Sequence, residues 1–122
     1  MSKVVVIEED AAMRALISEW LNGEGHVVMG LPSVNALSQS VPGCDIVILD
    51  LVNLRAQGAS VVSRARALFP GAALLGMSTQ LGRTMDLCSA LARDLGISGL
   101  LAKPCMRDEL LKAFDQAIKT CD

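Results

Sequence analysis

Residues 44–58 read CDIVILDLVNLRAQG, a stretch in which an apolar run leads directly into a carboxylate. The run 46–49 precedes Asp50, and Leu51 and Val52 follow it. Such a short apolar run, bounded by polar residues, is typical of a strand buried on both faces of a parallel sheet. An ionised carboxylate is costly to bury, so Asp50 must remain hydrated, pair with a cation or bind a metal ion. Asp50 is therefore the first candidate for a functional residue.

Short apolar runs alternate along the chain with segments of helical period. The expected strands are 3–7, 26–30, 44–50, 72–77 and 98–103. Helices are expected around the stripe of Met13, Leu16, Ile17, Trp20 and Leu21, at 32–40 with Ser33 as its cap, from Val61 to Phe69, and at 83–95 and 106–120. Five strands alternating with five helices through right-handed crossovers predict a parallel sheet with helices on both faces.

Composition limits the class of protein. A chain of 122 residues suits a single domain, 1–122. Its hydrophobic content of 52% excludes general disorder. Its net charge of -2 shows that it does not have the excess of basic residues found in nucleic-acid-binding domains. No apolar stretch approaches the length of a membrane span, and the first residues turn acidic too soon for a signal peptide. The four cysteines are widely spaced without a C-x-x-C pair, which favours reduced thiols in a cytoplasmic protein.

Polar residues follow four of the five predicted strands. Sites in open α/β sheets gather outside the carboxyl ends of the strands. The residues at these ends are Glu8, Glu9 and Asp10 after the first strand, Asp50 in the third, Ser78 and Thr79 after the fourth, and Lys103 in the fifth. An acidic first loop disfavours a flavin or nucleotide, whose phosphates prefer glycines and a free helix N-terminus. It favours Mg²⁺, beside which Asp50 could act as a carboxylate nucleophile toward phosphorus.

These residues resemble the receiver domain of two-component response regulators, and the resemblance covers essentially the whole chain. It implies an α/β flavodoxin-like fold, a (βα)5 three-layer sandwich with a parallel five-stranded sheet of order 2-1-3-4-5. It also implies that Asp50 accepts a phosphoryl group from a histidine kinase or histidine phosphotransfer protein. The implied Mg²⁺ ligands are Glu8, Glu9, Asp50 and the backbone carbonyl of Val52. Ser78 matches the switch Ser/Thr, and Lys103 matches the lysine that pairs with the phosphoryl group.

The same resemblance implies a signalling domain rather than an enzyme. Such a domain assists its own aspartyl phosphorylation and dephosphorylation, and its output is the binding of a downstream protein. The resemblance further suggests a homodimer through the face built by helix 4, strand 5 and helix 5. Contacts with nucleic acid or a membrane are not expected of this domain.

Four positions depart from the pattern of the family. Glu9 stands where Asp is usual, Leu54 where Pro is usual, Thr79 where Ala or Gly is common, and Leu100 where Tyr or Phe is frequent. These departures favour an alternative, a phosphorylation-deficient pseudo-receiver that serves as a protein-interaction module. A flavodoxin-like enzyme or cofactor carrier is a third hypothesis, and the acidic first loop argues against it.

Simpler explanations also exist for the individual residues. The acidic residues 8–10 could form a solvated helix start, because acids interact favourably with the N-terminal end of the helix dipole. Ser78 could cap the helix that follows it, and Lys103 could be an ordinary surface charge. The hypothesis of a phosphorylation site therefore depends on whether these residues come together in the fold.

Overall fold

The computed structural model describes residues 2–36, 39–41, 43–51, 54–78, 96–102 and 106–119. The elements are, in chain order, β1 (Lys3–Ile7), α1 (Ala11–Gly23), β2 (Val27–Leu31), η1 (Val34–Ala36), β3 (Ile46–Asp50), α2 (Leu54–Leu68), β4 (Ala73–Ser78), β5 (Gly99–Ala102) and α4 (Arg107–Lys119). The strands form one sheet in the order β2-β1-β3-β4-β5, and every pairing is parallel. The predicted flavodoxin-like sheet order is confirmed.

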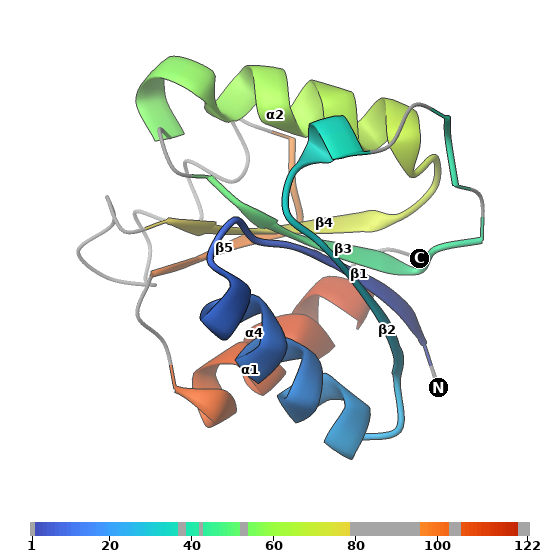
Figure 1. The fold of residues 1–122 in the computed structure, drawn as a ribbon, viewed down its shortest axis with the longest axis vertical. Helices are drawn as coiled ribbons and strands as arrows, with labels where there is room; N and C mark the ends of the chain where they lie inside the picture. Colours follow the sequence, from blue (N-terminus) through green and yellow to red (C-terminus); the bar gives the residue numbers. More distant parts are fainter. Residues whose placement is uncertain are drawn as a thin grey trace.

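Helices cover both faces of the sheet (Figure 1). The helix α2 and the short 3-10 helix η1 lie on one face, and α1 and α4 lie on the other. A separate apolar core fills the space on each side, one containing Val62, Leu68 and Phe69 of the α2 segment, the other containing Ile17 of α1 and Phe114 of α4. The molecule is thus a three-layer sandwich, as expected.

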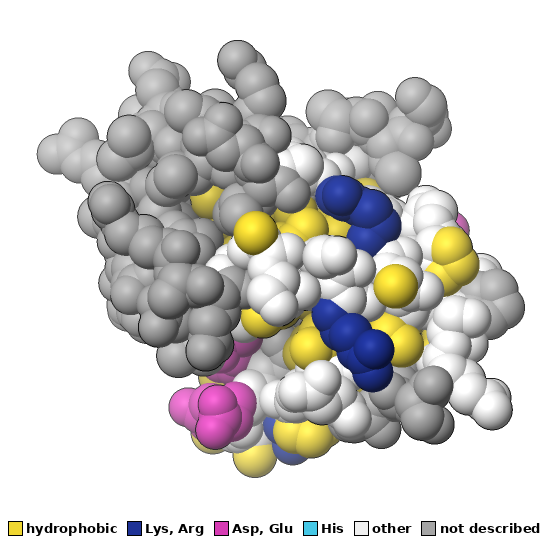
Figure 2. All heavy atoms as spheres, turned by 90° about the horizontal axis from the view of Figure 1, so that it is seen from above, with side chains coloured by type: hydrophobic (Ala, Val, Ile, Leu, Met, Phe, Trp, Pro, Cys, Tyr) yellow, Lys and Arg dark blue, Asp and Glu magenta, His cyan; other side chains and the backbone are white. Residues whose placement is uncertain are grey.

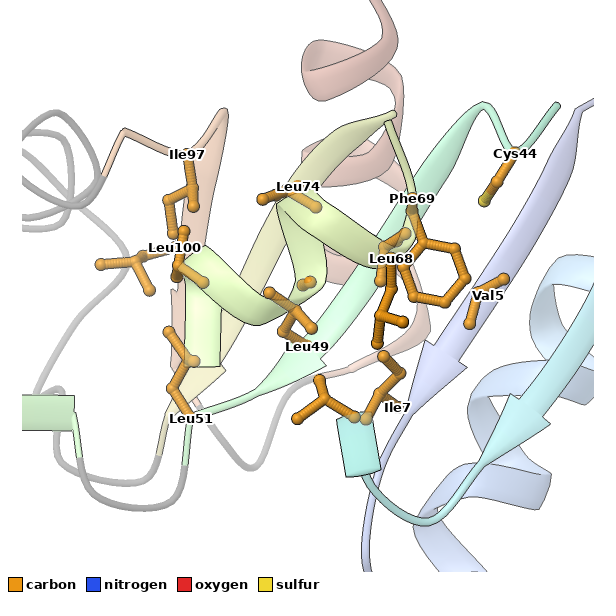
Figure 3. Close-up of a cluster of buried hydrophobic side chains, with 14 residues drawn as sticks. Val5, Ile7, Cys44, Leu49, Leu51, Leu68, Phe69, Leu74, Ile97 and Leu100 are labelled. Carbon is orange, nitrogen blue, oxygen red and sulfur yellow. The ribbon is translucent and has the colours of Figure 1, made fainter. Parts of the chain in front are cut away.

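The central strand β3 contributes to both cores. Val47 and Leu49 pack under α2, whereas Ile46 and Ile48 pack under α1 and α4, and all four side chains are fully buried. The core under α2 continues past the strand to Leu51, which Figure 3 shows near Leu100. The apolar run before Asp50 therefore forms a strand that is buried on both faces, as its sequence predicts.

Helix α1 is capped by the aspartate that precedes it and carries most of the predicted apolar stripe. The Oδ1 atom of Asp10 accepts hydrogen bonds from the backbone N–H groups of Ala12 and Met13, at 2.9 and 3.3 Å, which is a typical N-cap. Ile17 and Leu21 are fully buried. The prediction was wrong for Leu16, which is 41% exposed because it lies at the margin of the stripe, away from the sheet.

The remaining differences concern short or terminal segments. The helix expected over 32–40 is described only as η1, although the Ser33 hydroxyl accepts a bond from the Asn35 N–H at 3.1 Å, as a capping residue would. The helix expected over 83–95 lies outside the described residues. None of the described helices has the length and apolar character needed to cross a bilayer.

Candidate functional site

The strand register brings the predicted site residues to one edge of the sheet. Ile7 of β1 pairs with Leu49 of β3, so one residue further along both strands Glu8 lies next to Asp50. Asp50 in turn pairs with Met77 of β4, which precedes Ser78. Because adjacent strands lie about 4.8 Å apart, the backbones at these three positions are close neighbours. The carboxyl ends of β1, β3 and β4 therefore converge, as predicted.

The two carboxylates at this edge belong to the same face of the sheet. Side chains alternate along a strand, and Asp50 has the same parity as Ile46 and Ile48, which face α1 and α4. Glu8 shares the parity of Val6, which belongs to the same core. Glu8 is 1% exposed, whereas the Asp50 side chain is half-buried. The edge thus has a buried glutamate beside a half-buried aspartate.

The three acidic residues after β1 have different roles. Glu8 is buried and its N–H donates to the Leu31 carbonyl at 2.9 Å, so it extends the ladder between β1 and β2. Asp10 is exposed and caps α1. Glu9 is exposed between them. The simpler explanation of a solvated helix start therefore applies to Asp10 and does not apply to Glu8.

Ser78 is the third polar residue at this edge. It is the last residue of β4, it is fully buried, and it pairs with Ala102, the last residue of β5. By strand alternation it faces the α2 side of the sheet, together with Leu74. The Ser78 side chain therefore lies on the opposite face from Glu8 and Asp50, and its hydroxyl can reach an anion bound at Asp50 only around the end of β4.

Several predicted positions lie outside the described residues. Val52, Thr79 and Lys103 are among them, although Lys103 follows Ala102 directly in the sequence. Of the remaining departures from the family pattern, Leu54 is the first residue of α2, and Leu100 is buried in the core under α2. A leucine thus occupies the interior position at which the resemblance leads one to expect an aromatic ring.

The donor set at the sheet edge fits a hard cation. Within the part of the chain that is described, no group of three or more His, Cys, Asp or Glu side chains could hold a metal ion. Magnesium does not require such a group, because it commonly uses one or two carboxylates, with waters and a substrate phosphate as its other ligands. Glu8 and Asp50 can supply the carboxylates. The carboxylate oxygens present are therefore compatible with Mg²⁺ and poorly suited to softer metals.

Sequence reasoning missed two residues beside this edge. The Nη1 atom of Arg14 in α1 donates to the backbone carbonyl oxygen of Glu8 at 2.7 Å. A Cβ atom on Gly30 of β2 would lie 3.1 Å from Cδ of Arg14, so the arginine stem crosses the strand where it has no side chain. A glycine inside a strand often marks such a close approach, and this pattern was the available signal.

Figure 2 shows acidic side chains gathered at one edge of the α2 face of the molecule.

Two further side chains with reactive groups, those of Cys44 and His26, are packed against their neighbours. Cys44 is a free, buried thiol whose Sγ donates to the Ile46 carbonyl oxygen, and burial raises its pKa. Cys44 is therefore a packed core residue, while the other three cysteines lie outside the described residues. His26 is half-buried, with its ring 4.7 Å from that of Phe114. Its Nδ1 atom accepts the Ser2 N–H, so its surroundings are those of a packed side chain.

The comparisons with known proteins agree with this architecture. No protein-family model and no curated protein sequence matches the chain. Among solved structures, a receiver domain protein of Methanospirillum hungatei superposes with a TM-score of 0.78 at 15% identity, covering 99% of this chain and 96% of that one. A receiver domain protein of Clostridium thermocellum gives a TM-score of 0.75 at 22% identity, covering 98% of this chain and 96% of that one.

A third similar structure is a protein described as a pilus assembly protein from Burkholderia thailandensis. It superposes with a TM-score of 0.76 at 20% identity, and the match covers 98% of this chain and 99% of that chain. The chain therefore has the fold of response regulator receiver domains. Because this fold also occurs under another functional description, the function must be argued from the residues at the sheet edge.

Proposed function

We propose that the protein is a response regulator receiver that accepts a phosphoryl group on Asp50 in a Mg²⁺-dependent step. The observation that carries this proposal is the register of β1 and β3, in which Glu8 and Asp50 are neighbours at the carboxyl edge of the sheet. Ser78 lies at the end of the next strand. The receiver fold supports the same conclusion.

The chemistry assigned to Asp50 is nucleophilic. One oxygen of its carboxylate attacks phosphorus in line, and the bond from phosphorus to the leaving atom of the donor breaks as the new P–O bond forms. Mg²⁺ bound by Glu8, Glu9, Asp50 and the Val52 carbonyl would neutralise charge on the phosphoryl oxygens. Glu8 and Asp50 are neighbours at the sheet edge, and Glu9 would have to turn toward them, because the three carboxylates, which all lie in the described part of the chain, do not already form a metal-binding group. The half-buried state of Asp50 is compatible with this role, and the pairing of Asp50 with Met77 anchors its backbone.

Ser78 and Lys103 are assigned to the phosphorylated state. The Ser78 hydroxyl would donate a hydrogen bond to a phosphoryl oxygen, and the Lys103 ammonium would pair with another. Ser78 pairs with Ala102, the last residue of β5, and Lys103 follows Ala102 directly in the sequence. Their movement toward the phosphoryl group would shift the surface formed by β5 and α4 between two conformations.

The partners follow from this role. The phosphodonor would be a histidine kinase or a histidine phosphotransfer protein in the cytoplasm. The output would be the binding of a downstream protein, and a homodimer through segment 83–95, β5 and α4 would use the same surface. The domain would assist its own phosphorylation and dephosphorylation without acting as an enzyme on another substrate.

The test is direct phosphorylation. The protein is incubated with acetyl phosphate and Mg²⁺, and phosphate on Asp50 is detected by intact-protein mass spectrometry followed by peptide mapping. Asp50→Asn keeps the shape of the side chain but removes the carboxylate nucleophile, so it should not be labelled. Equal labelling of wild type and Asp50→Asn, with both folded by circular dichroism, would reject Asp50 as the acceptor.

The alternative is a pseudo-receiver that binds partners without phosphorylation. Two observations favour it: Glu9 is an exposed glutamate in place of the usual aspartate, and Leu100 fills the position of the aromatic switch. This alternative predicts no labelling of wild type at any Mg²⁺ concentration. The same labelling experiment therefore separates the two functions.

A further inference from the structure

The backbone of Glu8 is held from two directions. Its N–H donates to the Leu31 carbonyl oxygen of β2 at 2.9 Å. Its carbonyl oxygen accepts a hydrogen bond from Nη1 of Arg14 at 2.7 Å. This second contact fixes the peptide plane that joins Glu8 to Glu9, because the carbonyl of Glu8 and the N–H of Glu9 belong to the same planar unit.

The arginine reaches Glu8 by crossing β2 at a glycine. A Cβ atom on Gly30 would lie 3.1 Å from Cδ and 3.2 Å from Cγ of Arg14, which is closer than ordinary van der Waals contact. Gly30 does not have a positive φ, so its backbone does not require glycine. The close approach of the arginine stem therefore accounts for the missing side chain at this position.

The backbone after Glu8 is also anchored, in the turn of residues 8–10 that joins β1 to α1 and that we call the acidic corner. Asp10 caps α1 through its side chain, and its carbonyl accepts the Arg14 N–H at 2.9 Å. Arg14 thus bonds to the residue on each side of Glu9, through its backbone to Asp10 and through its guanidinium to Glu8. Glu9 is left exposed between two fixed neighbours.

We propose that Arg14, given room by Gly30, is a positioning residue for the acidic corner. By fixing the Glu8–Glu9 peptide plane it aims the two carboxylates toward the place that a cation beside Asp50 would occupy. The relation to the cation rests on the proposed function. The effect on the backbone does not, because it follows from the two hydrogen bonds of Arg14 alone.

The experiment uses two matched pairs of variants. Arg14→Met keeps an unbranched apolar stem but removes the donor, whereas Arg14→Lys restores one donor on a slightly shorter stem. Gly30→Ala pushes on the arginine stem, whereas Gly23→Ala adds the same methyl group where nothing lies within 4 Å. The first readout is the backbone ¹⁵N order parameter of Glu9 without metal, and the second is the Mg²⁺ binding isotherm by calorimetry.

We expect the Glu9 amide to become more mobile in Arg14→Met and Gly30→Ala, to recover in part in Arg14→Lys, and to remain unchanged in Gly23→Ala. Mg²⁺ binding should weaken about three- to tenfold in Arg14→Met, the upper value corresponding to about 1.4 kcal/mol. An equally rigid Glu9 amide in Arg14→Met and wild type would overturn the proposal whether or not Mg²⁺ binds. A wild-type protein with a rigid Glu9 amide but no Mg²⁺ isotherm would instead count against the proposed function and leave the positioning role of Arg14 supported.

Discussion

Gly76, in the middle of β4, has no room for a side chain. A Cβ atom at this position would lie 2.8 Å from Cδ2 of Leu100, 2.8 Å from Cδ1 of Leu51 and 3.1 Å from Cδ1 of Ile97. Two of these distances are shorter than real Cβ contacts, so the neighbouring side chains must move in Gly76→Ala. Figure 3 shows Leu51, Ile97 and Leu100 together at one end of the core under α2.

The expected loss of stability can be worked from these contacts. Inserting a methyl group into a packed core costs about 1–3 kcal/mol. Replacing glycine by alanine also lowers the entropy of the unfolded chain, which returns about 0.4–1 kcal/mol. The free energy of unfolding should therefore fall by about 1–2 kcal/mol, and Tm by about 4 °C for each kcal/mol in a chain of this size. Urea denaturation followed by far-UV circular dichroism measures the change.

A double-mutant cycle identifies the cause. Leu100→Ala alone should cost about 2–5 kcal/mol. It also removes one of the two atoms that lie 2.8 Å from the added methyl group. The destabilisation of the double variant should therefore be smaller than the sum of the two single destabilisations by about 0.5 kcal/mol or more. Gly23→Ala is the control, because its added methyl group meets nothing within 4 Å. Undiminished stability in Gly76→Ala, or strict additivity with Leu100→Ala, would contradict the packing of Leu100 against β4.

Three further predictions concern the site and its surroundings. In Lys103→Ala, phosphorylation should persist but the accompanying shifts of the amide NMR signals of β5 and α4 should be lost; retained shifts would make Lys103 a surface charge. Glu9→Asp should tighten Mg²⁺ binding several-fold, up to about tenfold or 1.4 kcal/mol, because a glutamate in a site shaped for aspartate would have to bend or displace the ion. Calorimetry that finds no gain would indicate a pocket adapted to Glu9. Burial raises the pKa of the Cys44 thiol above its ordinary value of 9.0, so the folded protein holds this proton more tightly than the unfolded chain does. The resulting stability is present below that ordinary value and is lost as pH rises through the folded pKa. Urea denaturation should therefore show a steeper alkaline loss of stability in wild type than in Cys44→Ala, and equal slopes would contradict this.

The sequence predicted the sheet because its strands are short apolar runs that both faces must bury. The run before Asp50 is short and wholly apolar, as expected of a strand buried on both faces, and the strand order followed from the resemblance to receivers. The position of Leu16 was wrong because helical periodicity defines a stripe without fixing its width. A helix was expected over 32–40, but the described residues of this segment contain only a short 3-10 helix. The type and length of such a short segment are hard to predict, because it carries little periodic signal.

The candidate site was predicted less completely than the fold. Strand ends could be located from the sequence, so the neighbouring positions of Glu8 and Asp50 were expected. The separate roles of residues 8–10 were not predicted, because the burial of Glu8 and the capping by Asp10 depend on where β1 ends and α1 begins. Arg14 and Gly30 are sixteen residues apart in sequence and meet only when α1 folds against β2. Such a contact leaves no periodic trace in a single chain.

The packing of the residues on either side of Asp50 holds the backbone of this proposed phosphorylation site. Leu49 and Leu51 on either side of it are buried in the core under α2, and the Leu51 N–H donates to the Met77 carbonyl oxygen at 2.7 Å. The backbone that carries the carboxylate is therefore anchored in the core. This would favour the proposed in-line attack, because misplacement by about 1 Å can slow a reaction about 100-fold. Leu51 is also one of the side chains that Gly76→Ala would displace. If the rigidity of this backbone positions Asp50, phosphorylation by acetyl phosphate should be slower in Gly76→Ala even at a temperature where the variant is fully folded. Unchanged phosphorylation kinetics in the folded variant would show that the orientation of Asp50 does not depend on the packing of Leu51.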